Sequence, residues 1–164
     1  MYSRILLAYD GSLEGRIALR EGALVALRSD ARVFLLSVIA PSAGMEIAES
    51  VYAGPIGQRE AFYRAVLDEG ALRLKEIELT VEAKLSAGDP AREIAAFARQ
   101  IRADLVVVGH RRKNPFVRWW SGPSGANLSD LLDCSLLISR NTMGDDEFQV
   151  ALASARSLHG RVRP

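Results

Sequence analysis

The chain has 164 residues, of which 49% are hydrophobic and 25% charged, the composition of an ordinary soluble globular protein. Its 21 Lys and Arg residues against 20 Asp and Glu residues give a formal net charge of +1, which argues against a dedicated nucleic-acid binder with a strongly basic surface. One cysteine and two histidines exclude a Cys-rich or His-rich metal centre, and no apolar run approaches the roughly 18 residues of a membrane span.

Short apolar segments alternate with longer amphipathic ones, which is typical of βα units around a parallel sheet. The first expected strand is Ile5–Tyr9. No signal-peptide pattern precedes it, so a cytoplasmic protein is expected. The strand ends at Asp10-Gly11-Ser12, where Ser12 is expected to cap a helix. The apolar positions of that helix fall near one face and are Leu13, Ile17, Leu24 and Leu27.

The second expected strand covers residues 32–39 and is stopped by Pro41, which has no backbone N–H. Residues 41–57 contain three glycines and two prolines and predict a long loop. A helix follows, with Tyr63, Leu67, Leu74 and Ile77 on one side. A third strand is expected at Thr80–Ala87.

The second half of the chain repeats this alternation. Asp89 and Pro90 predict a helix start, because Asp caps helices and Pro suits their first position. The continuous valine run of residues 104–109 predicts a strand buried on both faces. A helix is expected at about 126–133, and a fifth strand at Ser135–Ser139. The last helix would align Phe148, Leu152, Ala155 and Leu158. Five βα units fit one doubly wound α/β sheet.

Two of these strand ends carry residues suited to a ligand site. In an open parallel sheet, ligands bind beyond the carboxyl ends of the strands, where the strand order reverses. Residues 9–12 stand at the end of the first strand, and residues 109–113, Gly-His-Arg-Arg-Lys, at the end of the fourth. If the two ends are neighbours, Asp10 faces a crevice lined by glycine and positive charge. The helix after Gly125 would offer N–H groups to an anion there, which suits a nucleotide.

Several segments together resemble the universal stress protein family. They are the YDGS turn, the LLSVIAP strand end, GDPAREIAAFARQIRADLVVVGH, and the ending Gly122…Cys134…LLIS. The resemblance covers about residues 3–140. It implies a Rossmann-like five-stranded parallel sheet, with strand order 3-2-1-4-5, flanked by helices. It also implies a domain over residues 1–140, a C-terminal helical extension over 141–164, and a homodimer that pairs its last strands, here Ser135–Ser139.

One branch of this family binds ATP through a Gly-x2-Gly-x9-Gly-Ser/Thr motif after the fourth strand. Gly109 and Gly122 match its first and third glycines, whereas Arg112 and Pro123 replace the second glycine and the Ser or Thr. Arg112 brings a side chain where glycine lets the backbone approach phosphate. Pro123 loses a hydroxyl and a backbone N–H. The phosphate half of the motif is therefore altered.

Other residues could replace what the motif has lost. Arg111, Arg112 and Lys113 could meet phosphate by charge, and Ser121, Ser124 or the Gly125 N–H could donate a hydrogen bond. Asp10 stands at the adenine-side aspartate of the family, and Val38 at a strand residue that contacts the base through its main chain. The resemblance thus implies ATP or another adenine nucleotide as ligand, with the adenosine half of the site intact.

Each of these residues also has a purely structural interpretation. Asp10 could instead satisfy N–H groups in its own turn, and the basic run with Arg118 could be a solvated loop. Trp119 and Trp120 could stack on a base or pack against the protein or a partner. His110 is interpreted as structural because it has no visible nucleophile partner or orienting acid. Cys134 is interpreted as a small core residue because it precedes a buried strand.

The sequence favours a non-catalytic universal stress protein that acts as a stress-response regulator or sensor, with or without an adenine nucleotide. No nucleophile–base pair or second placed carboxylate suggests a reaction. An alternative is an enzyme that hydrolyses ATP or transfers a phosphoryl or nucleotidyl group in the same crevice, with the arginines neutralising charge. A third hypothesis, single-stranded nucleic-acid binding through the Arg/Trp segment, predicts steep salt dependence.

Overall fold

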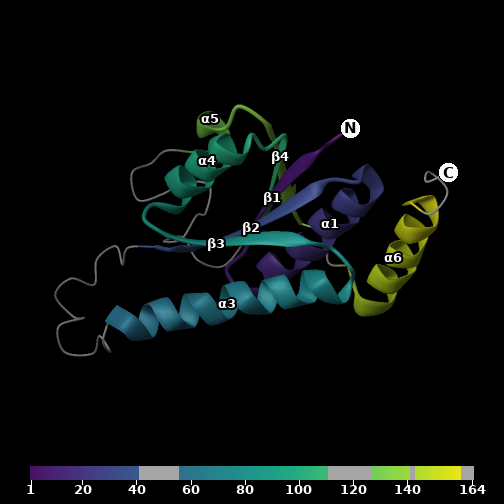
Figure 1. Cartoon of the computed structure of the whole chain (residues 1–164), viewed down its shortest axis with the longest axis horizontal. Coiled ribbons are helices and arrows are strands. Elements are labelled where there is room, and N and C mark those ends of the chain that lie inside the picture. The colour runs from purple at the N-terminus through teal and green to yellow at the C-terminus, as the bar shows by residue number, and fades with distance from the viewer. Residues whose placement is uncertain (41–55, 111–126, 141–142, 160–164) are drawn as a thin grey trace.

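The computed structural model describes residues 1–40, 56–110, 127–140 and 143–159. Within them, five parallel strands form one sheet in the order β3-β2-β1-β4-β5 (Figure 1). This confirms the predicted fold class and strand order. The strands, in chain order, are β1 (Arg4–Ala8), β2 (Arg32–Ile39), β3 (Val81–Ala87), β4 (Leu105–Gly109) and β5 (Ser135–Ser139).

Helices cover both faces of the sheet (Figure 1). Because successive strand residues point to opposite faces, Ile5, Leu7 and Tyr9 of the first strand segment face one layer, and Leu6 and Ala8 face the other. The first layer contains α1 (Leu13–Ser29) and α3 (Ile56–Glu76). The second contains α4 (Pro90–Ile101) and α5 (Leu128–Leu131). The sheet is thus buried between two apolar cores, as the valine-rich β4 predicted.

Helix α1 turns a different face to the sheet from the one expected. Its leucine stripe does not form the contact, since Leu13 is 69% exposed and Leu24 packs on the opposite side, against α6. Small residues such as Ala18 and Gly22 face the strands instead. A Cβ atom on Gly22 would lie 2.4 Å from Leu7 Cδ2. The helix backbone therefore approaches the sheet more closely than leucine side chains would allow.

The helix boundaries agree with the sequence in one case and differ in another. Asp89 caps α4 as predicted, accepting the Arg92 N–H at 3.0 Å, and Pro90 is the first helical residue. The helix expected at about 126–133 is shorter, because α5 covers only Leu128–Leu131. Leu132 already has extended backbone, with ψ of 137°, and the chain then enters β5 at Ser135.

The last helix, α6 (Asp145–His159), packs on the outer side of α1 (Figure 1). Phe148, Leu152 and Ala155 are buried against Leu24, which confirms three positions of the predicted apolar stripe. The side chain of the fourth, Leu158, lies outside the described residues. Among the helices that the structure describes, none is long and apolar enough to cross a membrane.

Candidate functional site

The ends of β1 and β4 lie together at the carboxyl edge of the sheet. The two strands are parallel neighbours in register, with Leu7 opposite Val107. A Cβ atom on Gly109 would lie 2.5 Å from the Glu14 carbonyl oxygen and 2.9 Å from the backbone nitrogen of Gly15, both in the first turn of α1. The end of β4 therefore contacts the first turn of α1, which directly follows the turn at residues 10–12.

The turn after β1 is built around the Asp10 carboxylate. Its Oδ1 accepts the Ser12 N–H at 3.0 Å and the Ser12 hydroxyl, and Gly11 has a φ of +74°. The Ser12 Oγ in turn accepts the Gly15 N–H at 3.0 Å, so Ser12 caps α1 as predicted. Asp10 thus has the structural role that the sequence left open. The half-buried carboxylate also lies beside the start of α1, where a helix favours negative charge.

Val38, near the end of β2, stands opposite Asp10 at the carboxyl edge of the sheet. The β1–β2 register ends with Ala8 opposite Leu36, so two residues further along each strand bring Asp10 level with Val38. Leu36 points its carbonyl toward β1, where it accepts the Tyr9 N–H at 2.9 Å. Because strand backbone groups alternate in direction, the Val38 N–H and C=O also face β1, beyond its last paired residue. Its side chain is buried in the core.

Tyr9, immediately before Asp10 in the segment that the sequence singled out, is fixed on several sides, and these contacts were not predicted. Its hydroxyl donates to Glu69 on α3, and its carbonyl accepts the buried Ser37 hydroxyl at 2.7 Å. Burial and the hydrogen bond to Glu69 raise the pKa of Tyr9 to about 12. The signal in the sequence was a tyrosine closing an otherwise aliphatic strand, since a buried hydroxyl needs a partner.

Several other predicted site residues cannot be placed. Arg111, Arg112, Gly122 and Ser124 lie outside the described residues, as do Trp119 and Trp120. His110 can be placed, because its backbone N–H donates to the Ser139 carbonyl at 3.0 Å and joins the ends of β4 and β5.

Cys134 is half-buried beside the α4 core. Burial, with smaller effects from Asp104 and Asp133, raises the pKa of its thiol. A raised pKa leaves little thiolate at neutral pH, which agrees with the structural interpretation.

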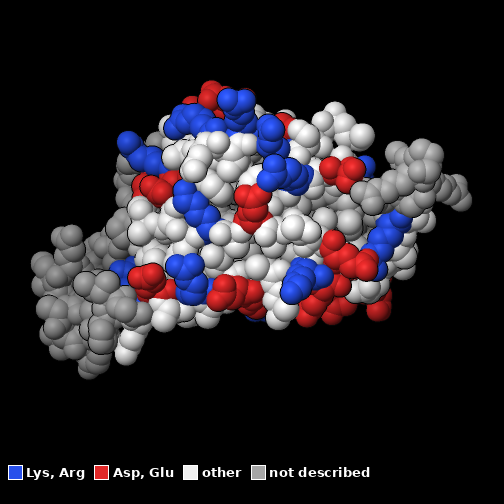
Figure 2. All heavy atoms as spheres, in the orientation of Figure 1, with Lys and Arg blue, Asp and Glu red and all other residues white. Residues whose placement is uncertain are grey.

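The described residues form no candidate metal site, and the face shown in Figure 2 is not uniformly basic. No group of three His, Cys, Asp or Glu side chains is placed to hold a metal ion among the residues that can be described. On the face shown in Figure 2, basic and acidic side chains are interspersed. This pattern matches the near-zero net charge.

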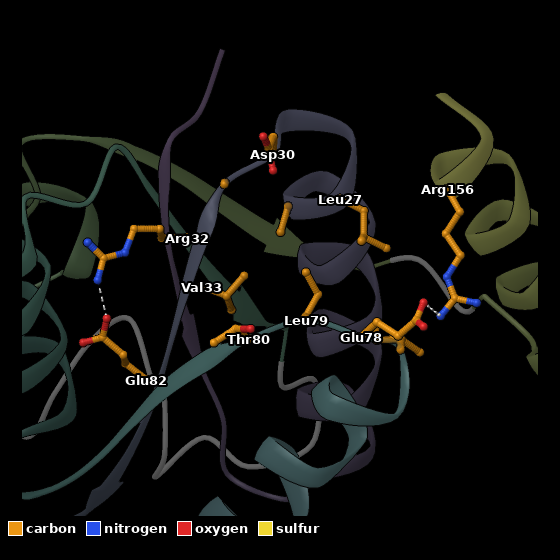
Figure 3. A pocket seen from close by; sticks show the side chains of 12 residues that line it. Leu27, Asp30, Arg32, Val33, Glu78, Leu79, Thr80, Glu82 and Arg156 are labelled. Carbon is orange, nitrogen blue, oxygen red and sulfur yellow. Dashed lines mark hydrogen bonds and ion pairs between the residues drawn. The ribbon is translucent and has the colours of Figure 1, made fainter. Parts of the chain in front are cut away.

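A cavity of about 680 Å³ lies at the opposite, amino edge of the sheet (Figure 3). Leu27, Val33 and Leu79 line it. Ion pairs close two of its sides, Arg32–Glu82 at 2.5 Å and Arg156–Glu78 at 3.0 Å. It is therefore separate from the Asp10 edge.

Comparison with known proteins agrees with this arrangement. The family model described as "Universal stress protein family" matches residues 1–140, and the chain belongs to that family. A Staphylococcus aureus (strain USA300) protein that bears the universal stress protein name is 27% identical, over 94% of both chains.

Solved structures share the fold. One is a universal stress protein in complex with cAMP, which is 22% identical and has a TM-score of 0.61 over 86% of this chain and 99% of the other. Another is an Arabidopsis thaliana family member with AMP bound, which is 20% identical and has a TM-score of 0.58 over 88% of this chain and 97% of the other.

Proposed function

We propose that this chain is a non-catalytic stress-response regulator that binds an adenine nucleotide at the carboxyl edge of its sheet. The proposal rests chiefly on one observation, the packing of Gly109 against the first turn of α1. This packing brings the end of β4 next to the Asp10 turn. The Val38 main chain is level with Asp10 on the other side and can offer a donor and an acceptor to a base edge.

The adenosine moiety is the proposed determinant of binding. The ligands of two solved relatives, cAMP and AMP, each contain a single phosphate, so this fold accommodates mononucleotides. In this chain, Arg112 and Pro123 stand where the ATP-binding motif has glycine and Ser or Thr. Arg111, Gly122 and Ser124 are the proposed residues on the phosphate side. We expect AMP and cAMP to bind at least as tightly as ATP.

A thermal-shift series with AMP, cAMP, ATP and GMP tests this proposal. Ligand at 100 times its Kd adds about 2.7 kcal/mol to stability. For a domain of this size, that raises Tm by roughly 5–11 °C. Asp10→Asn keeps the turn acceptor but removes the charge, so it should reduce the shift, whereas Asp68→Asn on the exposed side of α3 should not. Absence of any shift with millimolar adenine nucleotide would refute the proposal.

The same samples test the enzymatic alternative. A non-catalytic protein should leave ATP intact in a single-turnover experiment with protein in excess over nucleotide. ATP cleavage that Asp10→Ala abolishes would instead assign hydrolysis or phosphoryl transfer to this edge.

We further propose that the chain acts in the cytoplasm as a homodimer paired through β5. This strand ends the described sheet on one side, and its Leu136, Leu137 and Ile138 side chains are only partly buried. A partner strand would cover them and pair the edge.

A further inference from the structure

We propose a second ligand site, for a compact phosphate-bearing anion, in the groove between α1, α3 and α6. Arg16, Arg20, Arg73 and Arg156 line this groove, called here the arginine groove. It is distinct from the carboxyl edge proposed to bind the nucleotide. Its cavity measures about 450 Å³, which is ample for a pyrophosphate or a small phosphate ester.

The number of arginines is the first argument for an anion. Four arginines line the arginine groove together with two acids, Glu76 and Asp145, and two further acids outside that lining, Glu69 and Glu78, pair with three of the arginines. Helix α6 begins at Asp145, so the positive end of its dipole also points to this region. Arginine is suited to phosphate because its planar fork can donate two parallel hydrogen bonds.

Two of these arginines, Arg16 and Arg73, lie close to the same carboxylate oxygen of Glu69. Arg73 on α3 donates from Nε to Glu69 Oε1, and Arg16 on α1 lies with Nη2 3.6 Å from the same atom. The Arg73 and Arg16 side chains are 43% and 47% exposed, and both line the groove.

Arg20 is a third cation in the groove, and it already binds a carboxylate, that of Asp145, which would compete with a ligand phosphate. It lies one helical turn after Arg16, bonds the Asp145 carboxylate and the Met143 carbonyl, and stacks over the Phe148 ring at 5.3 Å. Arg156 also lines the groove, and it pairs with Glu78 at 3.0 Å (Figure 3). Asp145 therefore occupies a position that a ligand phosphate would share or take over.

Calorimetric titration of the full chain with inorganic pyrophosphate at low salt tests the site. We expect binding that weakens with added salt. Arg73→Gln should weaken it about tenfold or more, because a charge-assisted bond is lost. Asp145→Asn should strengthen it several-fold, because it removes a competing charge. Arg99→Gln, on the exposed face of α4, is the matched control and should leave binding unchanged.

Three outcomes would overturn this assignment. They are absence of binding at 5 mM pyrophosphate, binding that Arg73→Gln leaves intact, and citrate binding as tightly as pyrophosphate. Titration in the presence of saturating AMP separates the two proposed sites. Loss of pyrophosphate binding under AMP would place the anion at the carboxyl edge and refute the arginine groove.

Discussion

Gly109 packs directly against the carbonyl group of Glu14, so that a Cβ atom at position 109 would lie 2.5 Å from that oxygen and 2.6 Å from its carbon. Residue 109 ends β4, and residue 14 is in the first turn of α1. The contact therefore fixes the distance between the end of β4 and the Asp10 turn. Because the neighbouring atoms are backbone rather than flexible side chain, added volume cannot be absorbed locally.

Gly109→Ala should destabilise the fold and weaken adenine nucleotide binding together. We expect a loss of about 1–3 kcal/mol, the usual cost of overpacking. This corresponds to a Tm lower by very roughly 2–12 °C. Urea denaturation and nucleotide thermal shifts measure both effects. Gly144→Ala, where nothing lies within 4 Å of the added Cβ, is the control and should change neither.

The Tyr9 hydroxyl should make stability depend on alkaline pH. Its pKa is raised to about 12, first by burial and then by Glu69, so folding favours the neutral phenol. The contribution is complete below pH 10, the ordinary tyrosine pKa, and is lost as pH rises from 10 to about 12. Tyr9→Phe should cost about 1–2 kcal/mol at neutral pH, because Glu69 loses a donor.

Urea denaturation of the wild type and Tyr9→Phe between pH 8 and pH 12 measures this dependence. The two free energies of unfolding should converge at the alkaline end. A constant difference across the series would mean that Tyr9 ionises as freely in the folded chain as in the unfolded chain.

The outward backbone groups of β5 allow a sharp test of the proposed dimer. The Ser135 N–H bonds the Asp104 carbonyl, and the Ser139 carbonyl accepts the His110 N–H, so these odd-numbered residues face β4. By alternation, the Leu136 N–H points away from the sheet. Leu136→Pro removes that donor without breaking the β4–β5 ladder, and it should convert dimer to monomer in analytical ultracentrifugation.

Two controls separate strand pairing from side-chain loss. Leu136→Ala keeps the N–H and should remain dimeric. Ala83→Pro removes an outward N–H from β3 at the other edge of the sheet, and it should also remain dimeric. A wild-type chain that is monomeric at micromolar concentration would contradict the dimer outright.

The positions of the strands and helices could be predicted because their signals in this chain are local, whereas the strand order came from the family resemblance. The valine run of residues 106–108 and the Asp89-Pro90 start are each explained by near neighbours in the sequence. Once the resemblance put the first and fourth strands side by side, it followed that the Asp10 turn and Gly109 lie at the same edge, since adjacent parallel strands end together. The face that α1 turns to the sheet could not be predicted. The periodicity of large apolar residues predicted a leucine face, whereas in the structure Gly22 lies against Leu7.

The polar contacts of the site could not be predicted either, because they join residues far apart in the sequence. Tyr9 and Glu69 are sixty residues apart, and no pattern links a strand tyrosine to one of several acids on α3. The sequence analysis singled out none of Arg16, Arg20 and Arg73, which lie on two separate helices. Only the packing of α1 beside α3 and α6 brings them together.

Phe148 should hold α6 to α1, so its truncation should release the helix without unfolding the sheet. The ring is 7% exposed, packs against Leu24, and lies under the Arg20 guanidinium. Phe148→Ala should cost about 3 kcal/mol of local stability, which lowers hydrogen-exchange protection of α6 roughly 100-fold. Val150→Ala, at a side chain 72% exposed, should leave protection unchanged. Equal loss of protection in β1 and β4 would show instead that α6 and the sheet unfold as one unit.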